Sequence, residues 1–154
     1  MCSSDLSRVL GDTIIYPPSQ KIGRLGSVTA IWAGDLAEAQ SVVRKGGDVA
    51  NIEDLADLLE AEEARHTEWL AACGGRLVVL TPGEGGAVCI QDLPDGTWAV
   101  IGSGGYFVRG FLAAYPFPDD PNYTLDLCYA AMVACAKHMI CVGPPYTGRI
   151  LPCP

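Results

Sequence analysis

The sequence lacks any long apolar run and any excess of basic residues. Its 154 residues are 49% hydrophobic and 18% charged, and no stretch approaches the roughly 20 apolar residues of a membrane span. No basic start is followed by an apolar segment, so no secretory leader is predicted. Asp and Glu outnumber Lys and Arg by 18 to 10, and phosphate backbones need a basic surface, so nucleic acid is not an expected partner. The composition predicts a soluble cytoplasmic domain.

Motifs of several common chemistries are also missing. The seven cysteines include no CxxC pair and their number is odd, so neither a zinc site nor a disulfide framework is predicted. No glycine-rich loop ends in Gly-Lys-Ser/Thr, and a dinucleotide fingerprint that begins at Gly102 fails at Phe107. A hydrolase nucleophile elbow around Ser103 fails at Ile101, where glycine is required. The sequence therefore predicts neither a metal nor a cofactor.

Hydrophobic periodicity predicts strands and helices in a paired order. Strands are predicted over 13–16, 28–33, 76–81, 87–91 and 97–101, and helices over 35–45, 51–70, 105–114 and 124–140. Asp35 and Glu38 have the spacing of a capping box at the start of the first helix. Glycine- and proline-rich turns separate the last three strands, which predicts an antiparallel meander over 76–101. Paired helices favour a layered α+β sandwich over a doubly wound parallel sheet.

The segment Ile101-Gly102-Ser103-Gly104-Gly105 is the most informative part of the chain. It joins a predicted strand to a predicted helix, so a hydroxyl and several amides meet at a helix N-terminus, where partial positive charge collects. Such a turn serves either a bound phosphate or the polar side of a catalytic centre. Because the phosphate motifs fail, catalysis is favoured. A small-molecule site that uses the 102–105 turn remains an alternative, and Ser103 could also cap the helix.

Six segments, in their order and spacing, resemble the β-type proteasome subunits and especially the short HslV-like threonine peptidases. They are Ser7-Arg8-Val9, Gly11-Asp12-Thr13, Lys21-Ile22, the run from Trp32 to Ala39, the run from Ala99 to Gly105, and Pro145-Tyr146-Thr147-Gly148. The resemblance extends from about Ser7 to Ile150. It implies a four-layer αββα N-terminal-nucleophile hydrolase sandwich with antiparallel sheets, its first hairpin missing, in a single domain over 7–154.

The resemblance also implies a chemistry. In the family an N-terminal threonine attacks the peptide bond, and its own α-amine, with a reference pKa of about 7.7–8.0, accepts the proton. Lys21 matches the lysine whose charge lowers the pKa of that amine. Ser103 matches the serine that hydrogen-bonds the amine, and Gly34 matches the residue whose amide stabilises the oxyanion. Each also has an ordinary explanation, as a strand-surface lysine, a helix cap and a turn glycine.

The sequence departs from the family pattern at two places. The nucleophile is expected upstream of Ser7 and an aspartate directly before the Ser-Arg pair, but Leu6 stands there and residues 1–6 contain no threonine. Because Cys2-Ser3-Ser4-Asp5-Leu6 matches the translation of a sequencing-adapter string, residues 1–6 are interpreted as a non-native leader of a truncated chain. The second departure is Pro144, which stands where relatives often carry an aspartate before Pro-Tyr.

The family further implies partners. These are other copies of the chain in a homo-oligomeric ring, polypeptide substrates, and an AAA+ ATPase unfoldase. The predicted helices 51–70 and 124–140 are candidate contact surfaces. Without its threonine, the chain is predicted not to cleave peptides. The alternative from another class is a catalytically inactive structural ring subunit.

Overall fold

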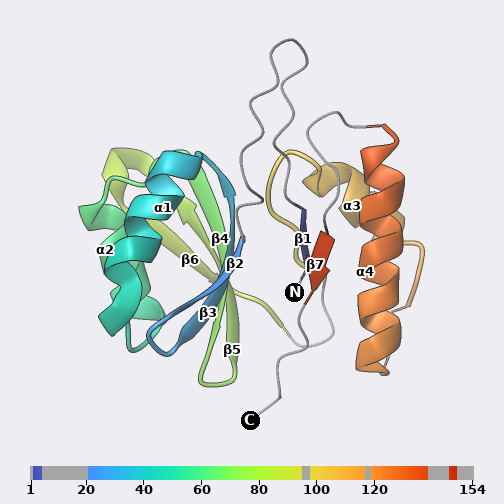
Figure 1. Ribbon diagram of the computed structural model, residues 1–154, viewed down its shortest axis with the longest axis horizontal. Helices are drawn as coiled ribbons and strands as arrows, with labels where there is room; N and C mark the ends of the chain where they lie inside the picture. Colours follow the sequence, from blue (N-terminus) through green and yellow to red (C-terminus); the bar gives the residue numbers. More distant parts are fainter. Residues whose placement is uncertain (1, 5–20, 95–97, 117–118, 139–145, 149–154) are drawn as a thin grey trace. The chain divides into compact units, whose positions relative to one another are not determined.

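The chain forms two compact units in a computed structural model, which describes residues 2–4, 21–94, 98–116, 119–138 and 146–148. The sheet unit comprises residues 22–102 and carries a five-stranded antiparallel sheet (Figure 1). The helical unit combines the first 21 residues with residues 103–152 and carries two helices and a two-stranded sheet.

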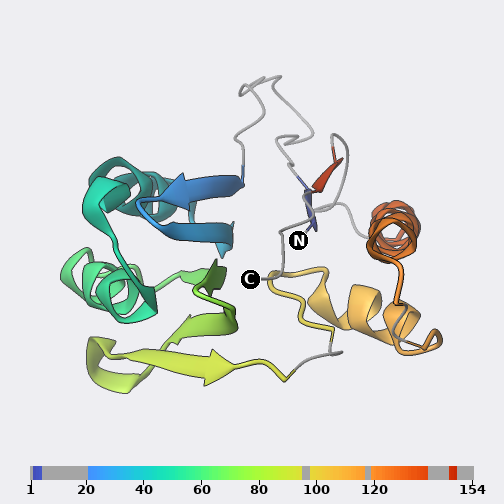
Figure 2. The ribbon, with the colours of Figure 1, turned by 90° about the horizontal axis from the view of Figure 1, so that it is seen from below.

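In the sheet unit, the order of the strands across the sheet is also their order along the chain. Its strands are β2 (Ile22–Leu25), β3 (Val28–Gly34), β4 (Thr67–Cys73), β5 (Arg76–Pro82) and β6 (Val88–Asp92), each antiparallel to the next. Between β3 and β4 the chain forms α1 (Leu36–Lys45), the short 3-10 helix η1 (Gly46–Asp48) and α2 (Ile52–Ala61). A second 3-10 turn, η2 (Glu84–Gly86), joins β5 to β6. Helices α1 and α2 lie together on one face of the sheet (Figure 2).

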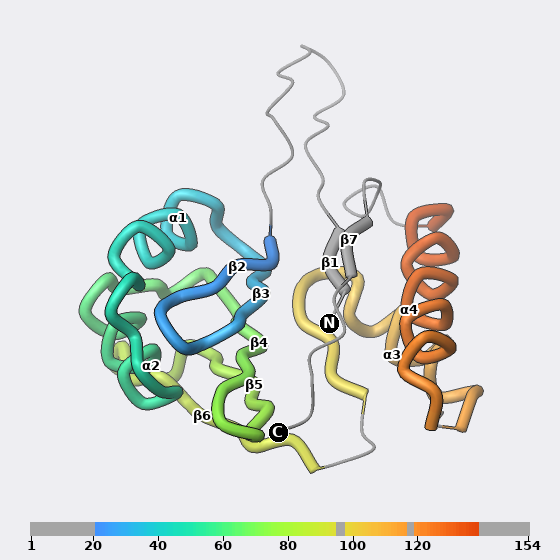
Figure 3. Tube along the Cα trace, turned by 60° about the horizontal axis from the view of Figure 1, so that its bottom comes forward, coloured from blue at the N-terminus to red at the C-terminus, as the bar shows by residue number. Residues whose placement is uncertain are grey.

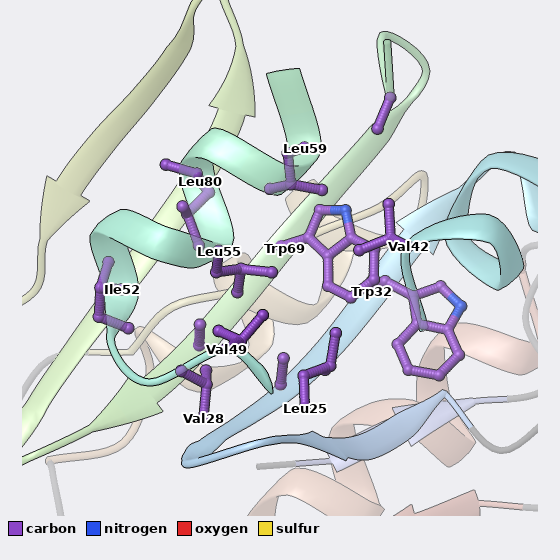
Figure 4. Packing of buried hydrophobic residues seen from close by; sticks show 14 of the residues in the cluster. Leu25, Val28, Trp32, Val42, Val49, Ile52, Leu55, Leu59, Trp69 and Leu80 are labelled. Carbon is purple, nitrogen blue, oxygen red and sulfur yellow. The ribbon is translucent and has the colours of Figure 1, made fainter. Parts of the chain in front are cut away.

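The core of this unit lies between the sheet and these two helices (Figure 4). Alternate residues of β3, among them Val28 and Trp32, face it because successive side chains of a strand point to opposite faces. Leu55 and Leu59 reach it from α2 and are almost fully buried. Each large side chain buried here stabilises the fold by about 1.5–3 kcal/mol. Trp32 also faces Trp69, its register partner on β4, with ring centroids 5.3 Å apart.

The helical unit contains α3 (Gly105–Leu112) and α4 (Pro121–Ala136), which lie against one another (Figure 3). Strand β1 (Cys2–Ser4) pairs antiparallel with β7 (Tyr146–Gly148), and α4 lies beside this pair. Leu112, Leu127 and Cys135 are buried within the unit. None of the helices in the described part of the chain is long and apolar enough to cross a membrane.

The predicted α+β fold with antiparallel sheets is confirmed, but the predicted helix 51–70 is wrong beyond Ala61. The chain turns there, with Glu63 at a φ of +50°, and residues 67–73 form β4 instead. Their burial alternates, since Thr67 and Trp69 are buried while Glu68 between them is exposed. A buried Trp69 fits the apolar face of a helix and that of a strand equally well, so this residue alone does not distinguish the two.

Three further elements differ from the sequence prediction. The meander consists of β4, β5 and β6 rather than three strands over 76–101, because residues 98–101 form no regular structure. Strand β2 was not predicted. Helix α4 begins three residues earlier than predicted, since Asp120 caps it and Pro121 is tolerated in the first turn. The predicted strand 13–16 lies outside the described residues.

Two ion-pair clusters lie on the surface of the sheet unit. Arg76 donates to Glu53 at 2.6 Å and to Asp92 at 3.0 Å, and these hydrogen bonds hold the pKa of both carboxyls below their usual values. Lys45 and Ser41 donate to the carboxylate of Glu62 and lower its pKa in the same way. All these groups are solvent-accessible, so each pair stabilises the fold only weakly.

Candidate functional site

Gly34 ends β3 in a backbone conformation that other residues rarely adopt. Its φ is +107°, and a methyl group added at its Cα would fall on the backbone carbonyl oxygen of His66. The same carbonyl accepts a hydrogen bond from the Asp35 amide at 2.9 Å. The close approach of two backbone segments therefore requires glycine at this place, independently of any catalytic role of the amide.

Directly after Gly34, the predicted cap of α1 is confirmed. Asp35 Oδ1 accepts hydrogen bonds from the amides of Ala37 at 2.8 Å and Glu38 at 3.0 Å. Glu38, however, does not play the reciprocal part that a capping box assigns to it. Its carboxylate accepts a hydrogen bond from the amide of His66 at 2.8 Å and contacts the Nδ1 of the same residue at 2.7 Å. His66 therefore lies in the turn before β4, where it holds that turn against α1.

The turn at 102–105 begins against the end of β3. Gly102 has a φ of +88°, and a methyl group added to it would lie 2.9 Å from the Cβ of Ala33. Its amide donates a 2.7 Å hydrogen bond to Oε2 of Glu68 on β4. Ala33 directly precedes Gly34 and is the register partner of Glu68. The structure thus brings Gly102 beside the residue that precedes Gly34.

Ser103 and Lys21 are at the boundaries of regular elements. Ser103 is exposed and stands between Gly102 and Gly104, and Gly104 is the N-cap residue of α3. Ser103 is therefore not the residue that caps this helix. Lys21 is half-buried in the bend directly before β2. Lys21 and Ser103 belong to the helical unit and Gly34 to the sheet unit, so the convergence of the three stays a prediction.

Sequence reasoning missed Glu68 and the structural role of His66. Both lie in the part of the predicted helix 51–70 that forms a turn and a strand. The polar Glu68 between buried Thr67 and Trp69 was the local pattern that could have revealed the strand. The segments at 7–13 and at Pro144 lie outside the described residues. Within the described part of the chain, no group of three or more His, Cys, Asp or Glu residues could hold a metal ion.

Comparison with known proteins identifies the fold. No protein-family model matches the sequence, and no curated protein sequence does. Solved structures do match. HslV from Trypanosoma brucei is 20% identical, with a TM-score of 0.64 over 94% of this chain and 88% of that chain. The chain shares the fold of HslV.

Two further structures agree with that result. BPH from Thiobacillus denitrificans, solved in complex with epoxomicin, gives a TM-score of 0.71 at 13% identity over 95% of this chain and 88% of that chain. A Gly-1 mutant of Anbu, the ancestral beta-subunit, from Hyphomicrobium sp. strain MC1 gives 0.68 at 13% identity over 94% and 73%. The fold is the N-terminal-nucleophile hydrolase fold that the sequence resemblance implied.

Proposed function

We propose that the chain is a threonine-type peptidase subunit of the HslV kind. The observation that carries the proposal is the contact between Gly102 and Ala33. It sets the residue before Ser103 beside the residue before Gly34, as a single catalytic centre would require. The shared fold with HslV supports the same reading.

Each residue has a defined role in the proposed site. The hydroxyl of a leading threonine attacks the peptide carbonyl carbon, and its proton passes to the α-amine of the same residue. Lys21 keeps that amine in its neutral, proton-accepting form by charge repulsion. Ser103 orients the amine through a hydrogen bond, and the Gly34 amide donates to the oxyanion, an interaction worth about 2.7–4 kcal/mol.

The proposal includes assembly into a homo-oligomer that encloses the sites and receives polypeptide from an AAA+ ATPase. Anbu from Pseudomonas aeruginosa was solved as a helical assembly. Helix α4 exposes 51% of Tyr123 and 45% of Val133 on its surface, which makes it a candidate contact. Light scattering is expected to give a mass of several subunits, and a stable monomer would contradict this part of the proposal.

The activity is tested with the chain preceded by a threonine-led β-hairpin, since residues 1–6 contain no threonine. A fluorogenic peptide is expected to be cleaved by this protein. The matched control changes the leading threonine to alanine, which removes the nucleophile and leaves the hairpin intact. Lys21→Ala is expected to abolish cleavage, and Ser103→Ala to lower kcat. Circular dichroism and thermal unfolding establish that all four proteins are folded.

A folded, threonine-led protein that leaves peptides intact would refute the peptidase assignment. If such a protein still assembled into a large oligomer, the structural ring subunit would be the correct alternative. Full activity after Lys21→Ala would refute only the role of Lys21 and would leave the peptidase assignment in place.

A further inference from the structure

Glu68 reaches the turn at 102–105 from a fixed place on β4. It is the register partner of Ala33, so the two side chains lie beside one another on one face of the sheet. Its neighbours Thr67 and Trp69 are buried on the opposite face, at 2% and 0% exposure. From this outer face, Oε2 of Glu68 accepts the Gly102 amide proton at 2.7 Å. A hydrogen bond to an ionised carboxylate is about twice as strong as one between neutral groups.

Ala33 and Glu68 contact Gly102 from two sides. The methyl group of Ala33 leaves no room for a side chain at Gly102, while the carboxylate of Glu68 binds its amide. The N-cap residue of α3 is Gly104, which supplies no side-chain hydrogen bond to the helix start. The first residue of the turn is therefore held by β3 and β4, whereas the carbonyl of Gly104 lies 3.9 Å from the Sγ of buried Cys135.

We propose that Glu68 is a positioning residue of the peptidase site. This inference rests on the proposed function, in which Ser103 orients the nucleophile amine. Ser103 follows Gly102 by one peptide bond, so contacts that fix Gly102 also bear on the position of Ser103. Without the carboxylate, the Gly102 peptide loses one of the contacts that fix it, and Ser103 is expected to shift from the place where it orients the nucleophile amine. A displacement of about 1 Å is enough to lower a rate by about 100-fold. The expected signature is a loss of kcat with KM unchanged.

The first experiment measures hydrogen exchange and chemical shift at the Gly102 amide in the full chain. Glu68→Ala is expected to speed exchange at Gly102 by roughly tenfold or more, because a charge-assisted hydrogen bond is lost. Glu68→Gln keeps an oxygen acceptor and is expected to restore most of the protection. The matched control is Glu60→Ala. Glu60 Oε1 accepts the Val88 amide at 2.7 Å in a similar exposed pair, so this change should alter Val88 and leave Gly102 as it was.

The second experiment compares kinetics in the threonine-led protein. Glu68→Ala is expected to lower kcat by tenfold to 100-fold without changing KM, Glu68→Gln to rescue most of the rate, and Glu60→Ala to retain it. Unchanged exchange at Gly102 in Glu68→Ala would overturn the inference, whatever the activity. If the parent protein is active and Glu68→Ala leaves its kcat unchanged, the inference is also overturned. If the folded parent protein is inactive, the proposed function fails, and the Gly102 measurement alone decides whether Glu68 holds the turn.

Discussion

The two paired tryptophans of the core differ in one respect that stability measurements can detect. Trp69 Nε1 donates to Oγ1 of buried Thr67 at 2.9 Å, and that hydroxyl donates in turn to the carbonyl of Ala64 at 3.2 Å. Trp32 Nε1 is buried and has no hydrogen-bond partner among the described residues. The substitutions Trp32→Phe and Trp69→Phe therefore remove the same atoms from different hydrogen-bonding environments.

Most contributions to the two free-energy changes cancel. Both side chains are at least 94% buried, since Trp32 is 6% exposed and Trp69 is 0% exposed, so the loss of apolar contact is similar. Their mutual ring contact at 5.3 Å is altered in either variant. What remains is the hydrogen bond of Trp69, worth about 1 kcal/mol, and the unpartnered donor of Trp32, whose burial costs about 1–3 kcal/mol. We expect Trp69→Phe to be more destabilising than Trp32→Phe by about 2–4 kcal/mol.

Urea unfolding followed by far-UV circular dichroism measures this difference, because the substitutions themselves change the tryptophan fluorescence. Equal m-values in the two variants would show that both unfold from equally compact native states. A third variant, Thr67→Val, removes the acceptor and should lower the stability through the same hydrogen bond. The reasoning is refuted if Trp32→Phe costs as much free energy of unfolding as Trp69→Phe, or more.

Three further predictions concern the backbone and the surface. Gly34→Ala is expected to lower the free energy of unfolding by about 3 kcal/mol, since the new methyl group meets the His66 carbonyl at a positive φ. Gly110→Ala lies in exposed helix with open space around it and is expected to raise the free energy of unfolding by about 0.5–1 kcal/mol; urea titration checks both signs. Arg76 lowers the pKa of two carboxyls, so their stabilisation is complete above the unfolded pKa near 4 and is lost as pH falls through the lower folded pKa. The Tm of the parent chain should therefore fall more steeply below pH of about 4 than that of Arg76→Met. The control Arg24→Met should keep the parent slope, because Arg24 donates to the backbone carbonyl of Gly26 and contacts no carboxylate within the described part of the chain.

Local patterns were sufficient where each residue's environment is set by its sequence neighbours. Strand β3 and helix α1 were predicted because Asp35 is a helix cap and Gly34 a turn residue directly after an apolar run. The same holds for β5 and β6, whose ends carry glycine and proline. These features decide secondary structure over a few residues, so they can be recognised without the fold.

The boundary between α2 and β4 could not be recognised in this way. The turn after Ala61 contains no glycine or proline, and it uses Glu63 in a left-handed conformation that the residue type does not predict. Long-range contacts determine where α2 ends and β4 begins. Glu38 binds His66 from 28 residues away, and Trp69 packs on Trp32. The strand forms because of these contacts rather than because of its local sequence.

The same error concealed the residue that binds the Gly102 amide. On the predicted helix, Glu68 would lie on the solvated side among other acidic residues, a position that indicates no functional role. On β4 its place is fixed opposite Ala33, where a small neighbour leaves space for Gly102 and for the 2.7 Å hydrogen bond to its amide. The Gly-Ser-Gly-Gly turn can be read from the sequence, but its support comes from 34 residues away along the chain. A turn with three glycines has little conformational preference of its own, so the proposed catalytic centre requires such an outside contact, and Glu68 provides one to Gly102.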